Sequence, residues 1–489
     1  MEHITFNSAY KDYLDDFELK KRKWFLVLIP FFHLILLIIF LKFKNPFIII
    51  GIIFSLLILK WIAFSVQNTI IILMCYISFL PNYAWGSRYS FFHKLYFQEP
   101  VLLFFMSLIF LWSIFSNYSR SGIRNTQINS KLNWIPLLFI VWIVISVLLG
   151  SFLNSDLELV RVDFLYLFLY VFYFIFTIYF SSNQLSHLVN VVALIAVAVS
   201  IEFTLLAFSE INPVSILVTR VVTQQPHLAQ IGFPILASNI LFYTNKWKKL
   251  FSVIGLLPVT CMIFFSQQRG LWVGIIFSLI VLGGFKFIKN KITLVQVFKY
   301  LMIILLIFAS LVVILLLLDR FLFGSVLITV FSRMNTLTAL STDESLNIRL
   351  FEIIRALHQW DNNIFNILFG TGLGSHYGAV RIDRLNTVSL DNSFAYILWK
   401  MGIIGFILFM FIYIQFFIKG LFIYIHSKVL FHKQLIAAIL SAIAGLCVIG
   451  LTNACLVRYR FIIFWALLLA IVELLYRQTK RGLTQNVES

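Results

Sequence analysis

Long apolar stretches separated by short polar segments fill more than half of the chain. About fourteen of them approach the roughly 20 residues that a helix needs to cross a bilayer. Because almost every position in them is apolar, they lack the polar face that a helix on a water-soluble core presents. The candidate spans are 24–42, 46–60, 64–80, 100–117, 134–153, 162–180, 186–208, 227–243, 250–266, 270–288, 299–318, 392–418, 434–452 and 461–476. The pattern predicts an all-α, polytopic integral membrane protein with about fourteen transmembrane helices.

The composition excludes a water-soluble protein. Of the 489 residues, 61% are hydrophobic and only 12% are charged, whereas a soluble domain carries roughly 25% charged residues. The net charge of +18 could suggest a nucleic-acid partner, but basic cytoplasmic loops explain most of this surplus, and no nucleic acid is expected. The four cysteines lie within or beside apolar stretches without CxxC spacing, so neither a disulfide framework nor a metal site is expected.

Basic residues between the stretches predict the orientation in the membrane. The polar segment 1–23 ends in four consecutive basic residues directly before the first stretch. If this segment is cytoplasmic, the loops near 118–133, 244–249, 286–299 and 419–433 are cytoplasmic too, and each contains lysine or arginine. We therefore expect a multi-pass membrane protein with both termini in the cytoplasm, 477–489 forming the C-terminal tail.

One long polar segment, 319–391, separates the first eleven predicted spans in 24–318 from the last three in 392–476. Loops of this length are usually functional or disordered. Apolar residues from Leu346 to Trp360 recur at helical spacing, and Ser341 to Glu344 just before them have the form of a capping box. The segment is therefore predicted to be a large external loop that folds into a small helical cap on the outer membrane surface.

Arginine carries the positive charge of the predicted outer side, whereas lysine dominates the cytoplasmic side. These arginines are Arg161, Arg220, Arg269, Arg320, Arg333, Arg349, Arg355, Arg381, Arg384, Arg458 and Arg460. A guanidinium binds phosphate or carboxylate through two parallel hydrogen bonds, which an ammonium cannot do. A charge near membrane depth costs roughly 2.5–3.5 kcal/mol, so each arginine should have a partner. That partner is either an acid such as Asp163 or Glu352, or an anionic substrate that arrives from the lipid.

Three arginines are candidates for binding such an anion. Arg269 lies between two apolar runs with no acid nearby in the sequence; its structural alternative is a side chain that reaches the membrane interface. Arg220 precedes the helix that begins near 227, and Glu210 could be its ion-pair partner. Arg349 could pair with Glu352, three residues later on the same helix.

Other polar residues allow both a functional and a structural interpretation. Asp391 and Asn392 begin the helix after the large loop, where either could be a helix cap. The sequence Gly-Thr-Gly-Leu-Gly at 370–374 resembles a phosphate-binding loop, but it lacks the strand–turn–helix context, so a close backbone approach is favoured. His227 is isolated in the sequence, and no metal-ligand motif occurs, so no metal site is expected.

Four short motifs in the second half of the chain together carry a family resemblance. They are Arg220 followed by Pro226-His227-Leu228-Ala229; Phe265-Ser266-Gln267-Gln268-Arg269-Gly270-Leu271-Trp272; Asn347-Ile348-Arg349 followed by Trp360 and Phe369-Gly370-Thr371-Gly372-Leu373-Gly374; and Asp391-Asn392-Ser393-Phe394 through Met401-Gly402-Ile403-Ile404-Gly405. In this order they resemble the O-antigen ligase and polymerase superfamily of bacterial envelope polysaccharide synthesis. The resemblance covers 220–405, and Gln268 stands where serine is commoner in the family.

The resemblance implies a glycosyltransferase-C-like fold and an inverting, metal-independent glycosyl transfer without a cofactor. The implied donor is a glycan on undecaprenyl diphosphate, and the acceptor is a hydroxyl of another lipid-linked repeat unit. In this interpretation Arg220, Arg269 and Arg349 bind the diphosphate and Asp391 is the general base. The predicted substrate site is completed by His227, Arg355, Arg381 and Asn392. Family members that act as ligases carry histidine where this chain has Asp391, which favours a repeat-unit polymerase for O-antigen, capsule, exopolysaccharide or teichuronic acid.

Three other interpretations stay open at this point. An O-antigen ligase would use the same donor with another acceptor. A structural or regulatory membrane protein would use neither a donor nor an acceptor. A flippase for lipid-linked oligosaccharides would also suit fourteen predicted spans. Transporters tend to show internal repeats, and no repeat between the two halves of the sequence is seen. For a polymerase, the expected partners are the lipid-linked donor and acceptor, membrane lipid, and a chain-length regulator.

Overall fold

The computed structural model describes residues 66–79, 133–153, 157–210, 226–243, 245–266, 268–287, 344–381, 384–387, 390–457 and 461–488. Within these ranges the fold is helical apart from one two-stranded hairpin. The predicted spans 24–42, 46–60, 100–117 and 299–318 lie outside the described residues. The number of fourteen spans therefore stays a prediction.

Most of the predicted spans in the described ranges coincide with helices. The helices are α3 (Val66–Phe79), α5 (Trp134–Phe152), α6 (Leu157–Phe168), α7 (Phe172–Tyr179), α8 (Leu185–Glu210), α9 (His227–Phe242), α10 (Lys246–Phe265), α11 (Arg269–Phe287), α14 (Glu344–Trp360), α15 (Ile364–Phe369), α16 (Ser393–His426), α17 (Leu430–Gly450) and α18 (Ile462–Glu488). Seven helical segments of the described chain are long and apolar enough to cross a membrane: α5, the α6–α7 segment, α8, α10, α16, α17 and α18. This result indicates a membrane protein, as the sequence predicted.

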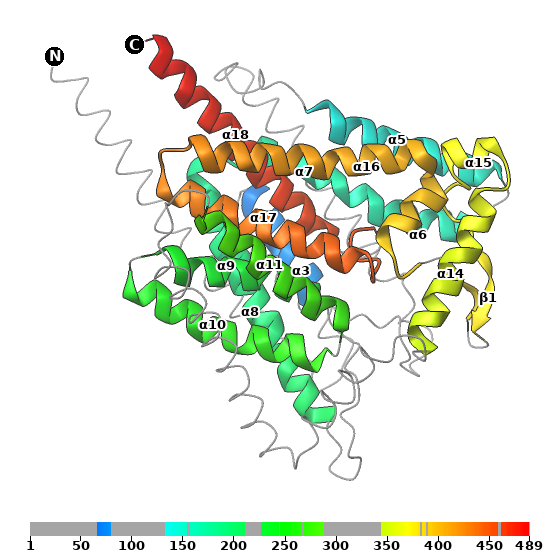
Figure 1. Cartoon of the computed structure of the whole chain (residues 1–489), viewed down its shortest axis with the longest axis horizontal. Coiled ribbons are helices and arrows are strands. Elements are labelled where there is room, and N and C mark those ends of the chain that lie inside the picture. Colours follow the sequence, from blue (N-terminus) through cyan, green and yellow to red (C-terminus); the bar gives the residue numbers. More distant parts are fainter. Residues whose placement is uncertain are drawn as a thin grey trace.

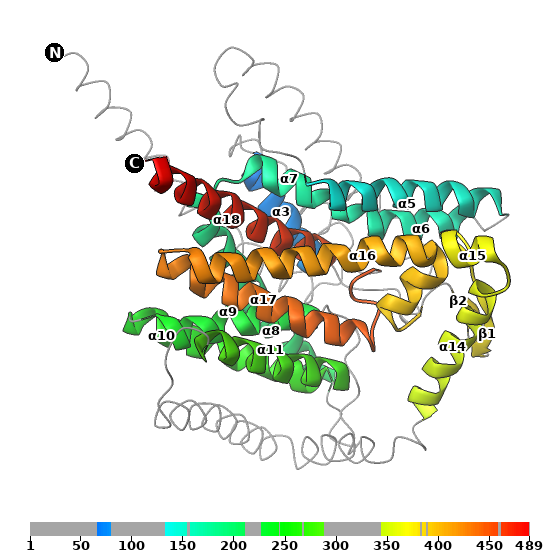
Figure 2. The same ribbon diagram turned by 45° about the horizontal axis from the view of Figure 1, so that its top comes forward.

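Helices α17 and α18 form the centre of the described bundle (Figures 1 and 2). Helix α17 packs against α9, α11 and α16, and α18 packs against α7 and α16. Small residues allow this close contact: a Cβ on Gly445 of α17 would lie 1.9 Å from Nε2 of Gln230 in α9. Peripheral helices instead expose large apolar side chains, including Phe251 of α10 and Phe411 of α16, as expected for a surface that faces lipid.

The amphipathic helix predicted in the large loop is α14, and it lies across one end of the bundle (Figures 1 and 2). Helix α15 and a hairpin lie beside it, while α18 ends at the opposite end of the bundle. The hairpin consists of β1 (Tyr377–Arg381) paired antiparallel with β2 (Arg384–Thr387). The described chain is otherwise helical, which confirms the all-α prediction. The hairpin was not predicted, because strands of five and four residues are too short to show an alternating pattern.

Three helices differ in extent or regularity from what the sequence predicted. Helix α16 continues to His426, so the predicted loop at 419–433 is reduced to the three residues between α16 and α17. Helix α18 continues to Glu488, which makes the predicted tail 477–489 largely helical. The predicted span at 162–180 is interrupted by a 3-10 turn, Leu169–Val171, between α6 and α7. A helix that leaves the hydrocarbon region can continue in water, and hydropathy alone does not detect this.

Candidate functional site

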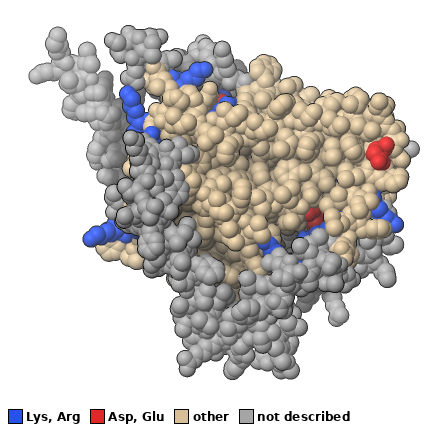
Figure 3. Space-filling view, in the orientation of Figure 1, with Lys and Arg blue, Asp and Glu red and all other residues tan. Residues whose placement is uncertain are grey.

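Two of the predicted site residues form an ion pair where α14 meets the start of α16. Arg349 Nε donates to Asp391 Oδ2 at 3.1 Å, and the two side chains remain 32% and 44% exposed. The sequence alternative was a local pair with Glu352, whereas Asp391 comes from another element, 42 residues later. Charged atoms are sparse among the described residues on the face that Figure 3 shows. A half-exposed guanidinium at the end of such a bundle is accessible to an anionic ligand.

Asn392 fixes the beginning of α16 in two ways. Its Oδ1 accepts from the backbone N–H groups of Phe394 and Ala395 at 3.0 and 2.9 Å, which confirms the predicted helix cap. Its Nδ2 donates to the carbonyl oxygen of Leu451 at 2.9 Å, in the connection between α17 and α18. Both ends of the amide are therefore engaged within the protein, and Asn392 positions Asp391 beside the positive end of the helix.

Arg269 begins α11 beside the same α17–α18 connection. A Cβ on Gly270 would lie 2.1 Å from Thr452 Oγ1, so the first turn of α11 touches the residue next to Leu451. A guanidinium at a helix N-terminus adds positive charge to the positive end of the dipole, and the first turn of α11 contains no acid. The backbone N–H groups and the positive end of the dipole at a helix N-terminus favour a bound anion.

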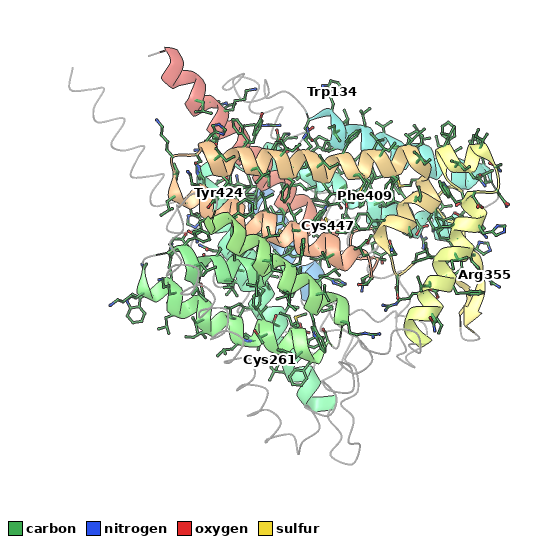
Figure 4. All side chains as sticks on the ribbon, in the orientation of Figure 1. Trp134, Cys261, Arg355, Phe409, Tyr424 and Cys447 are labelled. Atoms are coloured by element: carbon green, nitrogen blue, oxygen red, sulfur yellow. The ribbon has the colours of Figure 1, made fainter. Side chains whose placement is uncertain are left out.

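The remaining predicted residues are distributed differently. His227 is buried at the start of α9, and its ring lies 5.9 Å from that of Phe461, where the α17–α18 connection ends. Arg355 is exposed on α14 over the ring of Phe351 at 4.8 Å, at the outer edge of the molecule (Figure 4). Arg381 lies in β1, but the placement of its side chain is outside the described part, as is all of Arg220.

The arrangement therefore brings together Arg349, Asp391 and Asn392, with the first turn of α11 and its Arg269 beside the same connection. We call Arg349, Asp391, Asn392 and Arg269 the arginine site. Among the described residues, no group of three or more histidine, cysteine or acidic side chains could hold a metal ion. The positive charges that the structure places at this site are guanidinium groups and the N-terminus of α11.

A second ion pair, Lys400 with Asp163, was not predicted from the sequence. Both side chains are 0% exposed, and Asp163 Oδ2 also accepts from the Gly374 N–H at 2.9 Å. Asp163 had been considered only as a structural partner for an arginine. The sequence did contain a signal for these two residues, since Lys400 and Asp163 both lie within predicted spans. Ionisable residues inside apolar spans are functional candidates by default.

The glycine-rich segment at 370–374 is a site of close backbone contact, as predicted. Gly370, Gly372 and Gly374 all have φ near +84°, a conformation that residues with a Cβ rarely adopt. A Cβ on Gly372 would lie 2.5 Å from the backbone nitrogen of Gly150 in α5. The segment joins the cap to α5 and α16 rather than cradling a phosphate.

No protein-family model matches the chain, and no curated protein matches it in sequence.

Proposed function

We propose that the chain is a repeat-unit polymerase of bacterial envelope polysaccharide synthesis. It would join oligosaccharides carried on undecaprenyl diphosphate, on the outer face of the plasma membrane, within a fold of about fourteen spans of glycosyltransferase-C type. The observation that supports this proposal is the Arg349–Asp391 pair at 3.1 Å, exposed at the end of the bundle beneath α14. It puts an anion-binding group next to a carboxylate that can accept a proton.

The proposed reaction uses these groups in sequence. The diphosphate of the donor replaces the Asp391 carboxylate on Arg349 and also contacts Arg269, because both guanidinium groups attract its charge. Asp391 then accepts the proton of the acceptor hydroxyl, whose oxygen attacks the anomeric carbon as the bond to the diphosphate oxygen breaks. Undecaprenyl diphosphate leaves with the bonding electrons, and the arginines stabilise its additional negative charge.

A transporter of lipid-linked oligosaccharides is the second candidate, because two observations favour it. Helix α16 is interrupted at Gly402, and broken helices form the substrate sites of many transporters. The buried pair of Lys400 and Asp163 is an ionisable pair within the bundle. A ligase is the third candidate, and the acceptor distinguishes it from a polymerase.

Deletion of the gene separates the three activities. Loss of a polymerase should leave single repeat units that are exported and attached. Loss of a transporter should leave lipid-linked units on the cytoplasmic face, and loss of a ligase should leave long chains without their final acceptor. Analysis of the glycans by electrophoresis and mass spectrometry gives the answer, and either of the last two patterns would overturn the polymerase proposal.

Arg269→Lys tests the diphosphate contact directly. The substitution keeps the positive charge but removes the planar fork, so polymerisation of a purified lipid-linked donor should slow about tenfold or more. Arg481→Lys, at an exposed position near the end of α18, is the matched control and should leave the rate unchanged. A wild-type rate for Arg269→Lys would remove Arg269 from the proposed site.

A further inference from the structure

We propose that Asp163 and Lys400 are positioning residues, whose buried ion pair fixes the distance between Arg349 on α14 and Asp391, which lies just before α16. The pair belongs to the junction of α6, α16 and the glycine-rich segment 370–374, which we call the glycine junction. The inference goes beyond the proposed function, because it concerns how the arginine site is held together, whatever reaction occurs there.

The charges of the pair are entirely enclosed. Lys400 Nζ contacts Asp163 Oδ2, and both side chains are 0% exposed. The ammonium also lies 4.8 and 5.0 Å from the ring centroids of Tyr396 and Trp399. A buried ion pair contributes little net stability, but loss of one partner leaves an unpaired buried charge. The neighbouring backbone should therefore move when Asp163 loses its charge.

That backbone is the connection from the cap to the bundle. Helix α16 breaks at Gly402, where φ is +67° and ψ is −174°, and the break frees the carbonyl groups that precede it. Thr371 N donates to the Trp399 carbonyl at 3.0 Å, and Gly372 N donates to the Lys400 carbonyl at 3.1 Å. The Gly374 N–H completes the junction on Asp163 itself at 2.9 Å.

Both members of the Arg349–Asp391 pair are attached to this junction. On the cap, Gln359 of α14 accepts from Trp399 Nε1 at 3.2 Å, so the helix that carries Arg349 is bonded to the residue before Lys400. On the bundle, Asp391 directly precedes Asn392, the N-cap of the short helical segment that contains Lys400 and ends at the Gly402 break. A shift at Lys400 would therefore move the guanidinium relative to the carboxylate.

A purely structural ion pair would change stability and leave the cap in place. The chain offers a control for this alternative, since Lys419 Nζ pairs with Glu473 Oε2 at 2.6 Å between α16 and α18. That pair is also largely buried, at 14% and 5% exposure, and Arg477 joins it. Glu473→Gln should destabilise the bundle without reaching the cap.

Distances between nitroxide labels on the cap and the bundle test the proposal. The labels are placed on cysteines that replace the exposed His358 of α14 and Ser151 of α5, in a chain whose four native cysteines are alanine. Asp163→Asn should shift or broaden the distance distribution measured by pulsed electron spin resonance, whereas Glu473→Gln should leave it unchanged. The double variant Asp163→Asn/Lys400→Met removes both charges and leaves no unpaired buried charge, so we expect it to fold. Its distance distribution should change in the same way as that of Asp163→Asn.

Wild-type distributions in the Asp163 variants, or an equal broadening in Glu473→Gln, would overturn the positioning role. The second readout is the turnover of the lipid-linked donor. Asp163→Asn should lower this turnover about a hundredfold, because small misplacements of reacting groups have effects of that size. If the wild-type protein neither binds pyrophosphate nor polymerises the donor, the proposed function fails, while the label distances still decide the positioning role.

Discussion

Arg349 pairs with the carboxylate of Asp391, which lies outside α14, and the exposure of this pair allows Arg349 to bind another anion instead. One ion pair between half-exposed groups contributes at most about 1 kcal/mol to stability, so the pair is not needed to hold α14. The same guanidinium can exchange Asp391 for a phosphate oxygen with little cost to the fold. A residue that contributes so little to stability at such a position is typical of a binding site.

Arg349→Lys should reduce activity without unfolding the protein. A lysine keeps the charge but loses the second parallel bond, which is worth about 1.5–3 kcal/mol when the partner is charged. Turnover of the lipid-linked donor should fall about tenfold to a hundredfold, and the melting temperature in detergent should change little. Both quantities can be measured on the same preparation. A large drop in melting temperature would instead assign Arg349 a structural role.

Asp391→Asn should separate binding from catalysis. The amide has almost the same shape but cannot take a proton, and loss of a general base typically lowers turnover about 10²–10⁴-fold. Because Arg349 no longer has a competing carboxylate, pyrophosphate should bind at least as tightly as to the wild-type protein, as measured by calorimetry. Weaker binding together with normal turnover would contradict both roles.

At the scale of elements, the break in α16 shapes the cap end of the bundle. Gly402→Ala should destabilise the protein, because its φ of +67° costs about 1–2 kcal/mol for a residue with a Cβ. The new Cβ would also lie 2.3 Å from the carbonyl oxygen of Leu368. Gly284→Ala is the control, since a Cβ there meets nothing within 4 Å and lies in the regular helix α11.

Thermal unfolding in detergent compares the two glycine variants. Gly284→Ala should be neutral or slightly stabilising, because alanine favours a helix over glycine by roughly 0.5–1 kcal/mol. A Gly402→Ala protein that melts like the wild type would show that the break does not require glycine.

The sequence predicted helix boundaries correctly where polar residues flank an apolar run. It predicted them wrongly where a charged residue lies inside a helix. The predicted span 134–153 is Trp134–Phe152, and 227–243 is His227–Phe242. The predicted loop at 419–433 is wrong because Lys419 pairs with Glu473 of α18 at 2.6 Å, so α16 continues past this lysine. Local hydropathy detects the polar residues that flank an apolar run, but it does not detect that a lysine inside a helix has a distant partner.

The candidate site shows the same division. Arg349, Asp391 and Asn392 were predicted from two consecutive motifs of the resemblance, and Arg349 and Asp391, 42 residues apart, form an ion pair in the structure. The pairing of Lys400 with Asp163 joins residues 237 positions apart, and a single sequence gives no evidence of such a contact. Asn392 was assigned to the substrate, and its three hydrogen bonds within the protein give it a positioning role.

At the scale of the whole molecule, α17 connects two chemically different ends. With 21 residues it is about 32 Å long, close to the thickness of the hydrocarbon core. It begins near Asn239, to which Gln434 donates at 3.1 Å, and ends at Gly450 beside the start of α16. The lysines that begin α10 and the basic residues near the end of α18 lie at the first end, and the arginine site lies at the second (Figure 2).

Because cytoplasmic segments carry an excess of basic residues, the lysine-rich end at the start of α10 and the end of α18 is predicted to face the cytoplasm, and the arginine site to face outward. In intact cells, a cysteine that replaces His358 of α14 should react with a membrane-impermeant maleimide, whereas one that replaces Lys480 of α18 should react only after permeabilisation. Both side chains are exposed, so accessibility depends on the side of the membrane and not on burial. The reverse labelling pattern would put the arginine site in the cytoplasm, where polymerisation of exported repeat units could not use it.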